Sequence, residues 1–565
     1  MTARTPEAPA LADALIRLRR ELAGLELGLE LPGADEGRHL RDELVGQVDD
    51  YLLPRLRQMD APLLMVVGGS TGAGKSTLVN SLVGSQVSQA GVLRPTTRAP
   101  VLVCHPSDLH WFEDERILPG MARTTGGATN SGGLQLVPAE RVAPGLVLLD
   151  APDIDSVVES NRELAGQLLA AADSWLFVTT AARYADAVPW DMLHAARDRG
   201  TGLSLVLNRV PPEARNEVAS HLREMLAGEG LPEAEVLVVA ETELTDGMLP
   251  PEALAPVRGW LDALTADAQA RGELVRRTLT GALDSLAPRV GRVGEIVEAQ
   301  LEAADELRRA VEGAYGTALD EVDEAVKSGS LLRGEVLARW QDVVGSGDLM
   351  RALENRVGWL RDRVRALVTG TAPADTELKA AVQSSVDSVV HTAADRAAER
   401  AAARWRQHPS GRPLLEGAPR LDAASSELLP ATAEEVRAWQ GHVFELVREE
   451  GESKRTTARL ASLGLNGAGL TVMIAVFAST GGLTGVEVAV AGGTSALSQK
   501  LLEAIFGDQA VRALADRARQ DLIARVERLL DSEAARYLAL IEPVAPDRGG
   551  PERLKEALGE LERGR

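Results

Sequence analysis

A glycine-rich stretch at residues 69–76, with the sequence GSTGAGKS, constrains the fold of this chain more than any other feature. It matches the phosphate-binding loop pattern G-x-x-x-x-G-K-[ST]. The apolar run 63–67 before it is typical of a buried strand, and residues 77–83 after it have helical spacing. In this setting glycines let successive backbone N–H groups point at phosphate oxygens, and the following helix turns its positive end toward the same anion. We therefore predict that this loop holds the phosphates of a nucleoside triphosphate.

Two side chains of the loop carry specific expectations. Lys75 is expected to reach the β- and γ-phosphates, and the Ser76 hydroxyl is expected to bind Mg²⁺. We predict that the nucleotide contacts residues spread over the loop and the first helical turn: Gly69, Thr71, Gly72, Ala73, Gly74, Lys75, Ser76 and Thr77.

A second loop, residues 94–98 with the sequence RPTTR, follows at a distance suited to a nucleotide-sensing switch. A threonine there can close over Mg²⁺ and the γ-phosphate with its hydroxyl and its backbone. We predict catalytic roles for Thr96 and Thr97 beside Lys75, and a metal-binding role for Thr97. The prolines of this segment suit an ordinary loop equally well, and that alternative stays open.

The apolar run 146–150 ends in Asp150, which is predicted to hold Mg²⁺ together with Ser76 and Thr97. The alternative is a strand-end aspartate that caps a loop. Three residues later, GTPases with the pattern Asp-x-x-Gly have a glycine, whereas this chain has Asp153. A carboxylate at this position either lies near the γ-phosphate or moves the loop aside, and we expect slow hydrolysis in consequence.

The apolar run 203–207 leads into Asn208 and Arg209, which we predict to contact the nucleotide. GTPases show Asn-Lys-x-Asp here, and the aspartate reads guanine, but Pro211 occupies its position. ATP therefore stays an alternative to GTP. Further apolar runs at 174–180 and 236–240 alternate with helical segments, and residues 106–140 resemble an insertion in a hairpin. The pattern predicts a doubly wound, mostly parallel sheet in an α/β domain.

Net charge, cysteine content and the N-terminal sequence bear on the partners and the location of the protein. The formal net charge of −22 argues against nucleic acid as the main partner. The single Cys104 forms no internal disulfide, and the N-terminus lacks the apolar core of a signal peptide. We expect a cytoplasmic protein.

The rest of the chain predicts helices. Residues 274–326 form one long amphipathic helix or two helices broken near Pro288. Similar patterns fill 331–370, 376–405 and 434–450, with a loop at 408–420, and predict an elongated all-α stalk. The expected division is helices packing on the stalk at 1–60, a P-loop domain at 61–265, the bundle at 266–455, an apolar hairpin at 456–500 and return helices at 501–565.

The apolar hairpin has two interpretations. Between Arg459 and Lys500 the only charge is Glu487, and the uncharged run 460–478 nears the length of about 20 residues that spans a bilayer. If residues 460–497 enter a membrane as a hairpin, the basic residues at its two ends would both lie on the cytoplasmic face. The second arm of the hairpin, residues 483–497, is short, and together with Asn466 this favours a buried hairpin inside a helical bundle instead.

In its loop at 69–76, its segment 94–97, Asp150 and the order of its parts, the chain resembles the bacterial dynamin-like proteins. The resemblance implies a large GTPase with a helical stalk and a membrane-contacting tip. It also implies GTP and Mg²⁺ as ligands, and homo- or hetero-oligomers formed through the nucleotide domain. The implied function is membrane association or remodelling on the cytoplasmic face, for example at a bacterial division septum.

The chain departs from that family at three places. Thr71 and Gly72 replace the Gln-Ser pair of the family's loop, Asp153 stands in the second switch, and Pro211 stands in the guanine-reading motif. The amino-acid sequence of the loop is more similar to those of small-GTPase-like and septin-related domains. The alternative function is a soluble nucleotide-gated scaffold with weak or no hydrolysis, and an ATPase is the third reading.

Overall fold

The computed structural model describes residues 8–88, 100–114, 121–124, 133–153, 159–266, 268–328, 373–418, 420–451, 472–473, 476 and 508–565. Its contacts divide the chain into two compact units. Unit 1 comprises residues 1–27, 33–299 and 546–565, and unit 2 comprises residues 28–32 and 300–545.

Unit 1 contains a sheet whose eight described strands have the order β3-β4-β2-β5-β1-β6-β7-β8. Neighbouring strands run parallel, except that β2 and β5 are antiparallel. The strands are β1 (Leu63–Gly69), β2 (Val101–Cys104), β3 (Arg123–Thr124), β4 (Leu134–Pro138), β5 (Leu146–Asp150), β6 (Ser174–Thr180), β7 (Gly202–Val210) and β8 (Glu235–Ala240). The predicted mostly parallel sheet is confirmed, and the insertion at 106–140 adds β3 and β4 beyond β2.

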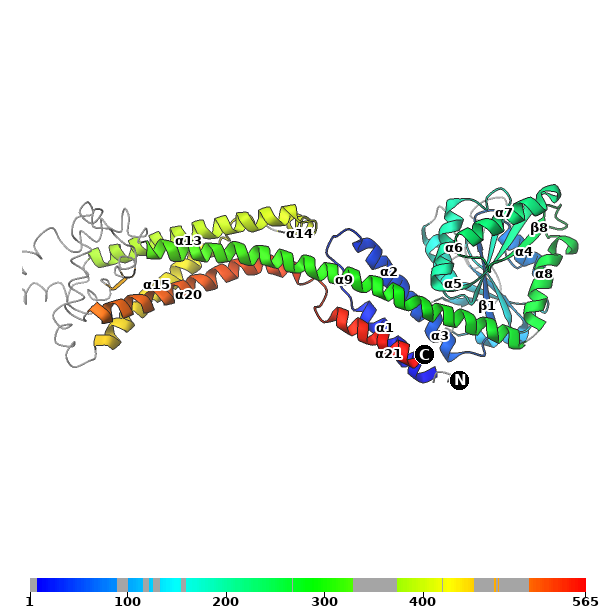
Figure 1. Ribbon diagram of the computed structural model, residues 1–565, viewed down its shortest axis with the longest axis horizontal. Helices are drawn as coiled ribbons and strands as arrows, with labels where there is room; N and C mark the ends of the chain where they lie inside the picture. Colours follow the sequence, from blue (N-terminus) through cyan, green and yellow to red (C-terminus); the bar gives the residue numbers. More distant parts are fainter. Residues whose placement is uncertain are drawn as a thin grey trace, which may run out of the picture. The chain divides into compact units, whose positions relative to one another are not determined.

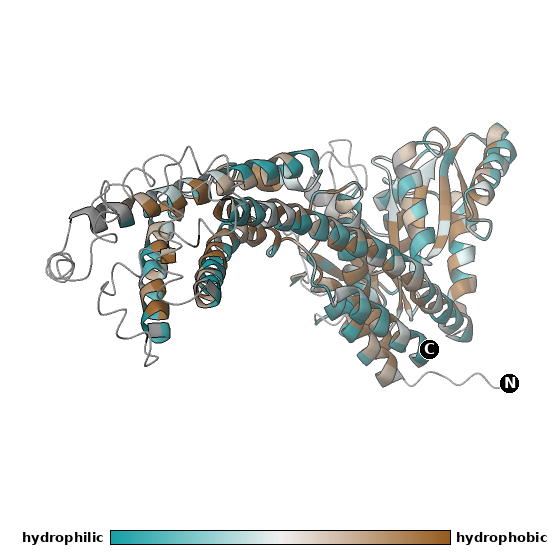
Figure 2. Cartoon of the chain, turned by 60° about the vertical axis from the view of Figure 1, so that its left-hand side comes forward, coloured by the Kyte–Doolittle hydropathy of each residue, from teal (hydrophilic) through white to brown (hydrophobic). Residues whose placement is uncertain are grey.

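Helices cover both faces of this sheet. The α-helices of the nucleotide fold are α4 (Lys75–Val83), α5 (Glu159–Ala170), α6 (Ala187–Arg199), α7 (Arg215–Gly228) and α8 (Pro251–Ala266), and two short 3₁₀ helices are η2 (Pro106–Trp111) and η3 (Pro212–Ala214). The apolar sides of α5, α6 and α7 bury one face, whereas α4, α8 and the start of α9 (Ala268–Lys327) bury the other. Figure 1 shows these layers, and the strands are brown over most of their length in Figure 2. Successive side chains of β1 pack alternately into the apolar cores on the two faces of the sheet, because neighbouring residues of a strand point to opposite faces.

The N-terminal helices complete unit 1. They are α1 (Ala8–Ala23), α2 (Ala34–Gln47), the π-helix η1 (Val48–Leu52) and α3 (Leu53–Arg57). Helix α1 packs against α21 (Gly550–Gly564), from the other end of the sequence. On α9, Arg289 donates to the Gln47 side chain at 2.6 Å and to Glu43 at 2.8 Å. The predicted helices thus pack on the first part of the long helix, within unit 1.

Unit 2 is helical in its described residues. Its core joins the second part of α9 to α13 (Pro373–Gln407), α15 (Leu428–Gly451) and α20 (Asp508–Ile541), with the short α14 (Gly411–Glu416) beside them. Figure 1 shows the long helices side by side. Helix α9 continues through Pro288 without a break, so the single-helix alternative holds. The predicted loop at 408–420 is wrong in part, because α14 lies inside it.

Candidate nucleotide-binding site

The glycine-rich loop joins β1 to α4, as the sequence predicts. Gly69 has φ of 140° and Gly74 has φ of 99°, both in the region that favours glycine. Space is also short, because a Cβ on Gly69 would lie 2.1 Å from the Val178 oxygen. A Cβ on Gly74 would lie 2.6 Å from Nδ2 of Asn208. Backbone conformation and close packing therefore both require glycine at these two positions.

The Lys75 ammonium is buried and is fully engaged. Its Nζ donates to the Gly69 oxygen at 2.8 Å, to the Ser70 oxygen at 3.2 Å and to Oδ1 of Asp153 at 2.5 Å. The side chain of Lys75 is 5% exposed, and that of Asp153 is 17% exposed. Asp153 therefore lies at the loop, and its partner is the lysine.

Asp150 lies at the C-terminal end of β5 and is fully buried. Its Oδ2 accepts hydrogen bonds from Ser76 at 2.7 Å and from Ser88 at 2.5 Å. Burial raises the pKa of Asp150, and the two serine hydroxyls oppose that effect. Its Oδ1 has no hydrogen-bond partner. A buried carboxylate with a free oxygen beside a serine hydroxyl supplies the hard oxygen ligands that Mg²⁺ takes, so the residues fit this ion.

Ser88 was missed by the sequence analysis. It comes directly before the residues that the structure leaves undescribed, 89–99, and Asn80 on α4 holds it in place. The Asn80 amide donates to the Ser88 oxygen at 2.8 Å, and its Oδ1 accepts from the Ser88 N–H at 2.9 Å. No pattern in the sequence marks this serine, because its partner Asp150 lies 62 residues away.

Thr96 and Thr97, predicted as catalytic, lie outside the described residues.

Asn208 braces the loop from the C-terminal end of β7. Its Nδ2 donates to the Ala73 oxygen at 2.8 Å, and its Oδ1 accepts from the N–H of Arg209 at 2.9 Å. Arg209 is exposed and has φ of 54°, which is uncommon outside glycine. A register shift between Leu207 and Val210 accommodates it. Both residues predicted to contact the nucleotide therefore lie at the same edge of the sheet as the loop.

Arg183, which follows β6, also contacts the loop. Its Nη1 donates to the Thr71 oxygen at 3.0 Å, and its Nε donates to Asp186 at 2.8 Å. The C-terminal ends of β1, β5, β6 and β7 thus supply the loop, Asp150, Arg183 and Asn208. Ligands bind at this edge of doubly wound sheets.

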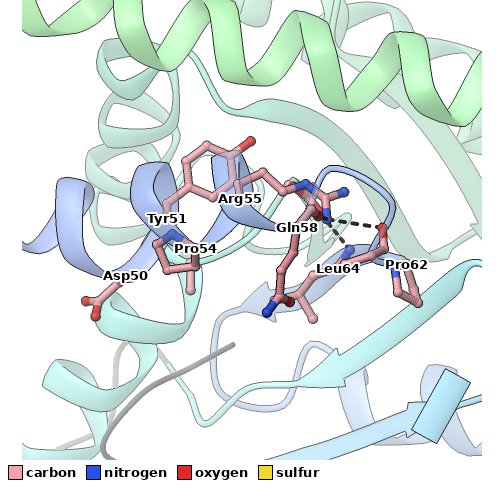
Figure 3. A pocket seen from close by; sticks show the side chains of 10 residues that line it. Asp50, Tyr51, Pro54, Arg55, Gln58, Pro62 and Leu64 are labelled. Atoms are coloured by element: carbon pink, nitrogen blue, oxygen red, sulfur yellow. Dashed lines mark hydrogen bonds and ion pairs between the residues drawn. The ribbon is translucent and has the colours of Figure 1, made fainter. Parts of the chain in front are cut away.

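A small polar cavity lies at the other end of β1. Figure 3 shows the residues that line it, among them Asp50 and Tyr51 from η1, Arg55 from α3 and Leu64 of β1. Arg55 forms a buried ion pair with Asp173 at 3.0 Å, and Asp173 accepts from the Leu64 N–H at 2.8 Å. The cavity measures about 20 Å³, which has room for one water. It is too small for a nucleotide. The Arg55–Asp173 pair beside it joins the N-terminal helices to the sheet.

Two kinds of feature are absent from the described residues. No group of three or more His, Cys, Asp or Glu side chains is arranged there as a metal site. Among the helices that the structure describes, which leave out most of 452–507, none is long and apolar enough to cross a membrane. Most of the predicted hairpin, 460–497, lies outside the described residues. The three described residues within it, Val472, Met473 and Val476, are buried in the core of unit 2.

Comparisons with known proteins found several similar chains. No family model matches. The chain is 28% identical over 134 residues to a probable transmembrane GTPase, FZO-like and chloroplastic, from Arabidopsis thaliana. That match covers 23% of this chain and 13% of the length of the plant protein.

Among solved structures, one member of an oligomerised bacterial dynamin pair matches with a TM-score of 0.40 and 10% identity. It was described as providing a mechanism for the long-range sensing and tethering of membranes, and the match covers 97% of this chain and 94% of that one. The LeoA bacterial dynamin GTPase from ETEC matches with a TM-score of 0.24 and 13% identity over 95% of this chain and 98% of that one. Two of the matching solved structures are thus described as bacterial dynamins.

Proposed function

We propose that this chain is a dynamin-like nucleotide switch that binds GTP and Mg²⁺ at residues 69–77. The observation that carries the proposal is the position of Lys75. Two of its ammonium hydrogens are fixed by the backbone oxygens of Gly69 and Ser70, and the third points to the place where an anion, here Asp153, is bound. A phosphate oxygen of a nucleotide suits that third hydrogen.

The other residues have complementary roles. Gly72 and Gly74 turn the backbone of the loop around the phosphates, and Asn208 holds the loop through Ala73. Ser76 and Asp150 would hold Mg²⁺, which neutralises charge on the β- and γ-phosphates when it is bound. Thr96 and Thr97 are proposed to close over the γ-phosphate. We expect slow hydrolysis, because Asp153 stands where GTPases with the pattern Asp-x-x-Gly have the glycine of their second switch.

The first test compares GTP with ATP. Binding of each to the full chain is measured by calorimetry with Mg²⁺, and Lys75→Ala serves as the variant that loses binding. We expect GTP to bind and Lys75→Ala to weaken it at least about tenfold, the loss expected for one charge-assisted hydrogen bond. The exposed Lys555→Ala is the matched control. Binding of ATP alone would contradict the GTPase proposal.

The membrane role is proposed through residues 460–497 on the cytoplasmic face, with septum assembly as one use. Its support is the apolar sequence of this segment and the membrane tethering described for the similar dynamin pair. The test is flotation with anionic liposomes of the full chain and of Val488→Asp, which places a charge in the second apolar arm. Loss of flotation in a variant that keeps its helical signal is the expected result. Failure of the unchanged protein to float would sink the membrane role.

Oligomers through the nucleotide domain belong to the same proposal. The resemblance to paired dynamins supports them, and sedimentation with and without GTP tests them. A species whose mass does not change with nucleotide is the contrary result.

A soluble nucleotide-gated scaffold is the second candidate. The specific observation that favours it is the burial of Val472, Met473 and Val476 in the core of unit 2, which suits a hairpin that packs inside the protein. Nucleotide binding without flotation would select this candidate.

A further inference from the structure

The ammonium group of Lys75 has three hydrogens, and the structure accounts for all of them. The two backbone oxygens, those of Gly69 and Ser70, belong to the loop itself. Asp153 supplies the third acceptor from a separate segment, after the end of β5. A nucleotide phosphate that binds Lys75 must therefore displace one of these three groups.

The carboxylate is the acceptor that yields most readily. Gly69 and Ser70 are buried, and the Gly69 backbone is pressed against Val178 of β6, so their oxygens are fixed by the fold of the loop. Asp153 is the most exposed of the three, and its side chain can return to water. From this we infer that Asp153 is a built-in competitor of the nucleotide: its carboxylate occupies the phosphate position on Lys75 and is expelled when a nucleotide binds. The inference rests on the proposed nucleotide-binding function.

Two consequences separate this competition from a simple charge effect. The β-phosphate is common to GDP and GTP, so displacement of Asp153 weakens both nucleotides by the same factor. A carboxylate that merely repels the γ-phosphate would weaken GTP more than GDP, because the repulsion grows with the ligand's charge. Without nucleotide, in contrast, Asp153 stabilises the protein by neutralising the buried Lys75.

The experiment measures GDP and GTP binding to the full chain, with Mg²⁺, in wild type, Asp153→Asn and Asp153→Glu. Asp191→Asn is the matched control, because Asp191 is an exposed carboxylate on α6 of the same unit. We expect Asp153→Asn to tighten GDP and GTP alike by about tenfold, or ~1.4 kcal/mol. Asp153→Glu keeps the charge and should stay within about threefold of wild type.

Thermal melting supplies a second readout. Asp153→Asn should melt below wild type without nucleotide and should gain more from saturating GDP, a pair of opposite effects that a purely structural residue would not give. Asp153→Gly repeats the measurement should the asparagine variant fail to fold.

Equal or weaker binding by Asp153→Asn would overturn the inference, and so would tightening of GTP alone. Absence of nucleotide binding in every variant, wild type included, would instead refute the proposed function itself.

Discussion

At the scale of residues, buried charges gather at both ends of strand β1. Lys75, Asp150 and Asp153 lie at the end where the loop begins, and the Arg55–Asp173 pair lies at the other. Ionised groups are costly to bury unless they are paired. Lys75 pairs with Asp153 and Arg55 with Asp173, and Asp150 accepts from two serine hydroxyls. Both ends of the strand therefore depend on specific polar contacts rather than on apolar packing alone.

Asp50 lines the same cavity as the Arg55–Asp173 pair and gives a prediction about the pH dependence of stability. Burial raises the pKa of Asp50 to about 6 from an ordinary value of 3.8, and the nearby Asp49 carboxylate adds to the shift. The folded protein therefore holds this proton more tightly than the unfolded chain. The stability that results is fully present below pH 3.8 and is lost as the pH rises through about 6.

We expect Asp50→Asn, which stays uncharged, to be more stable than wild type by about 1–2 kcal/mol at pH 8, a discounted value because the side chain is partly exposed. The difference should shrink to a few tenths at about pH 4. Urea unfolding across this range measures it, with the exposed Asp60→Asn as the control. A stability difference that does not change with pH would show that the charge of Asp50 is not the cause.

At the scale of elements, the sequence predicted those parts whose signal is local. The apolar runs 146–150 and 174–180 became β5 and β6 with the predicted bounds, because buried parallel strands are apolar throughout. Strand β3 has only two residues and left no period to detect. The π-helix η1 escaped because its sequence, VDDYL, continues an ordinary helical pattern.

The candidate site divides in the same way. The loop, Asp150 and Asn208 were predicted because each stands at the C-terminal end of an apolar run that reads as a strand. The contact of Arg183 with the loop joins residues 112 apart, and that of Asp153 with Lys75 joins residues 78 apart. A single sequence carries no signal for which distant polar groups will meet, so Asp153 as the partner of Lys75 and Ser88 as a partner of Asp150 came only from the fold.

A clamp in unit 2 gives a prediction at this scale. The fully buried Gln300 on α9 accepts from the Leu29 N–H at 3.0 Å and donates to the Leu29 oxygen at 2.7 Å. Gln300→Leu leaves both backbone groups of Leu29 unpaired, and each buried unpaired group costs ~1–3 kcal/mol.

We expect Gln300→Leu to lower the free energy of unfolding by about 2 kcal/mol or more. Denaturant unfolding followed by circular dichroism measures it, and the exposed Gln520→Leu on α20 is the matched control. A change of under ~0.5 kcal/mol would mean that water replaces the lost bonds.

At the scale of the whole molecule, neither unit is one continuous segment. The chain passes between the units after residues 27, 32, 299 and 545. Unit 1 therefore depends on α21, whose buried residues Leu554, Ala557 and Leu561 pack with α1. Residues near 550 should thus influence the stability of the unit that holds the loop at residue 69.

Leu554→Ala tests this dependence. Leu554 is 2% exposed, and removing a buried leucine side chain costs ~2–5 kcal/mol. We expect the melting transition of unit 1, recognised as the one that saturating nucleotide shifts upward, to fall by several degrees. Leu244→Ala, at a leucine of the same unit that is 50% exposed, should leave it unchanged. A fall confined to a transition that nucleotide does not shift would contradict the assignment of α21 to unit 1.

The pairing of α1 with α21 also sets the order of events on the ribosome. Helix α1 is translated before α21 and carries a stripe of four leucines, Leu11, Leu15, Leu18 and Leu22, which are buried in the folded protein. The residues of α21 that pack with it are translated more than 500 positions later. At about 5–20 residues per second, that interval lasts on the order of half a minute or longer. During that interval α1 can pack against α2, η1 and α3 but not against α21, so part of its apolar surface lacks its final partner. We expect efficient production of this protein to depend on chaperones that bind apolar segments of nascent chains.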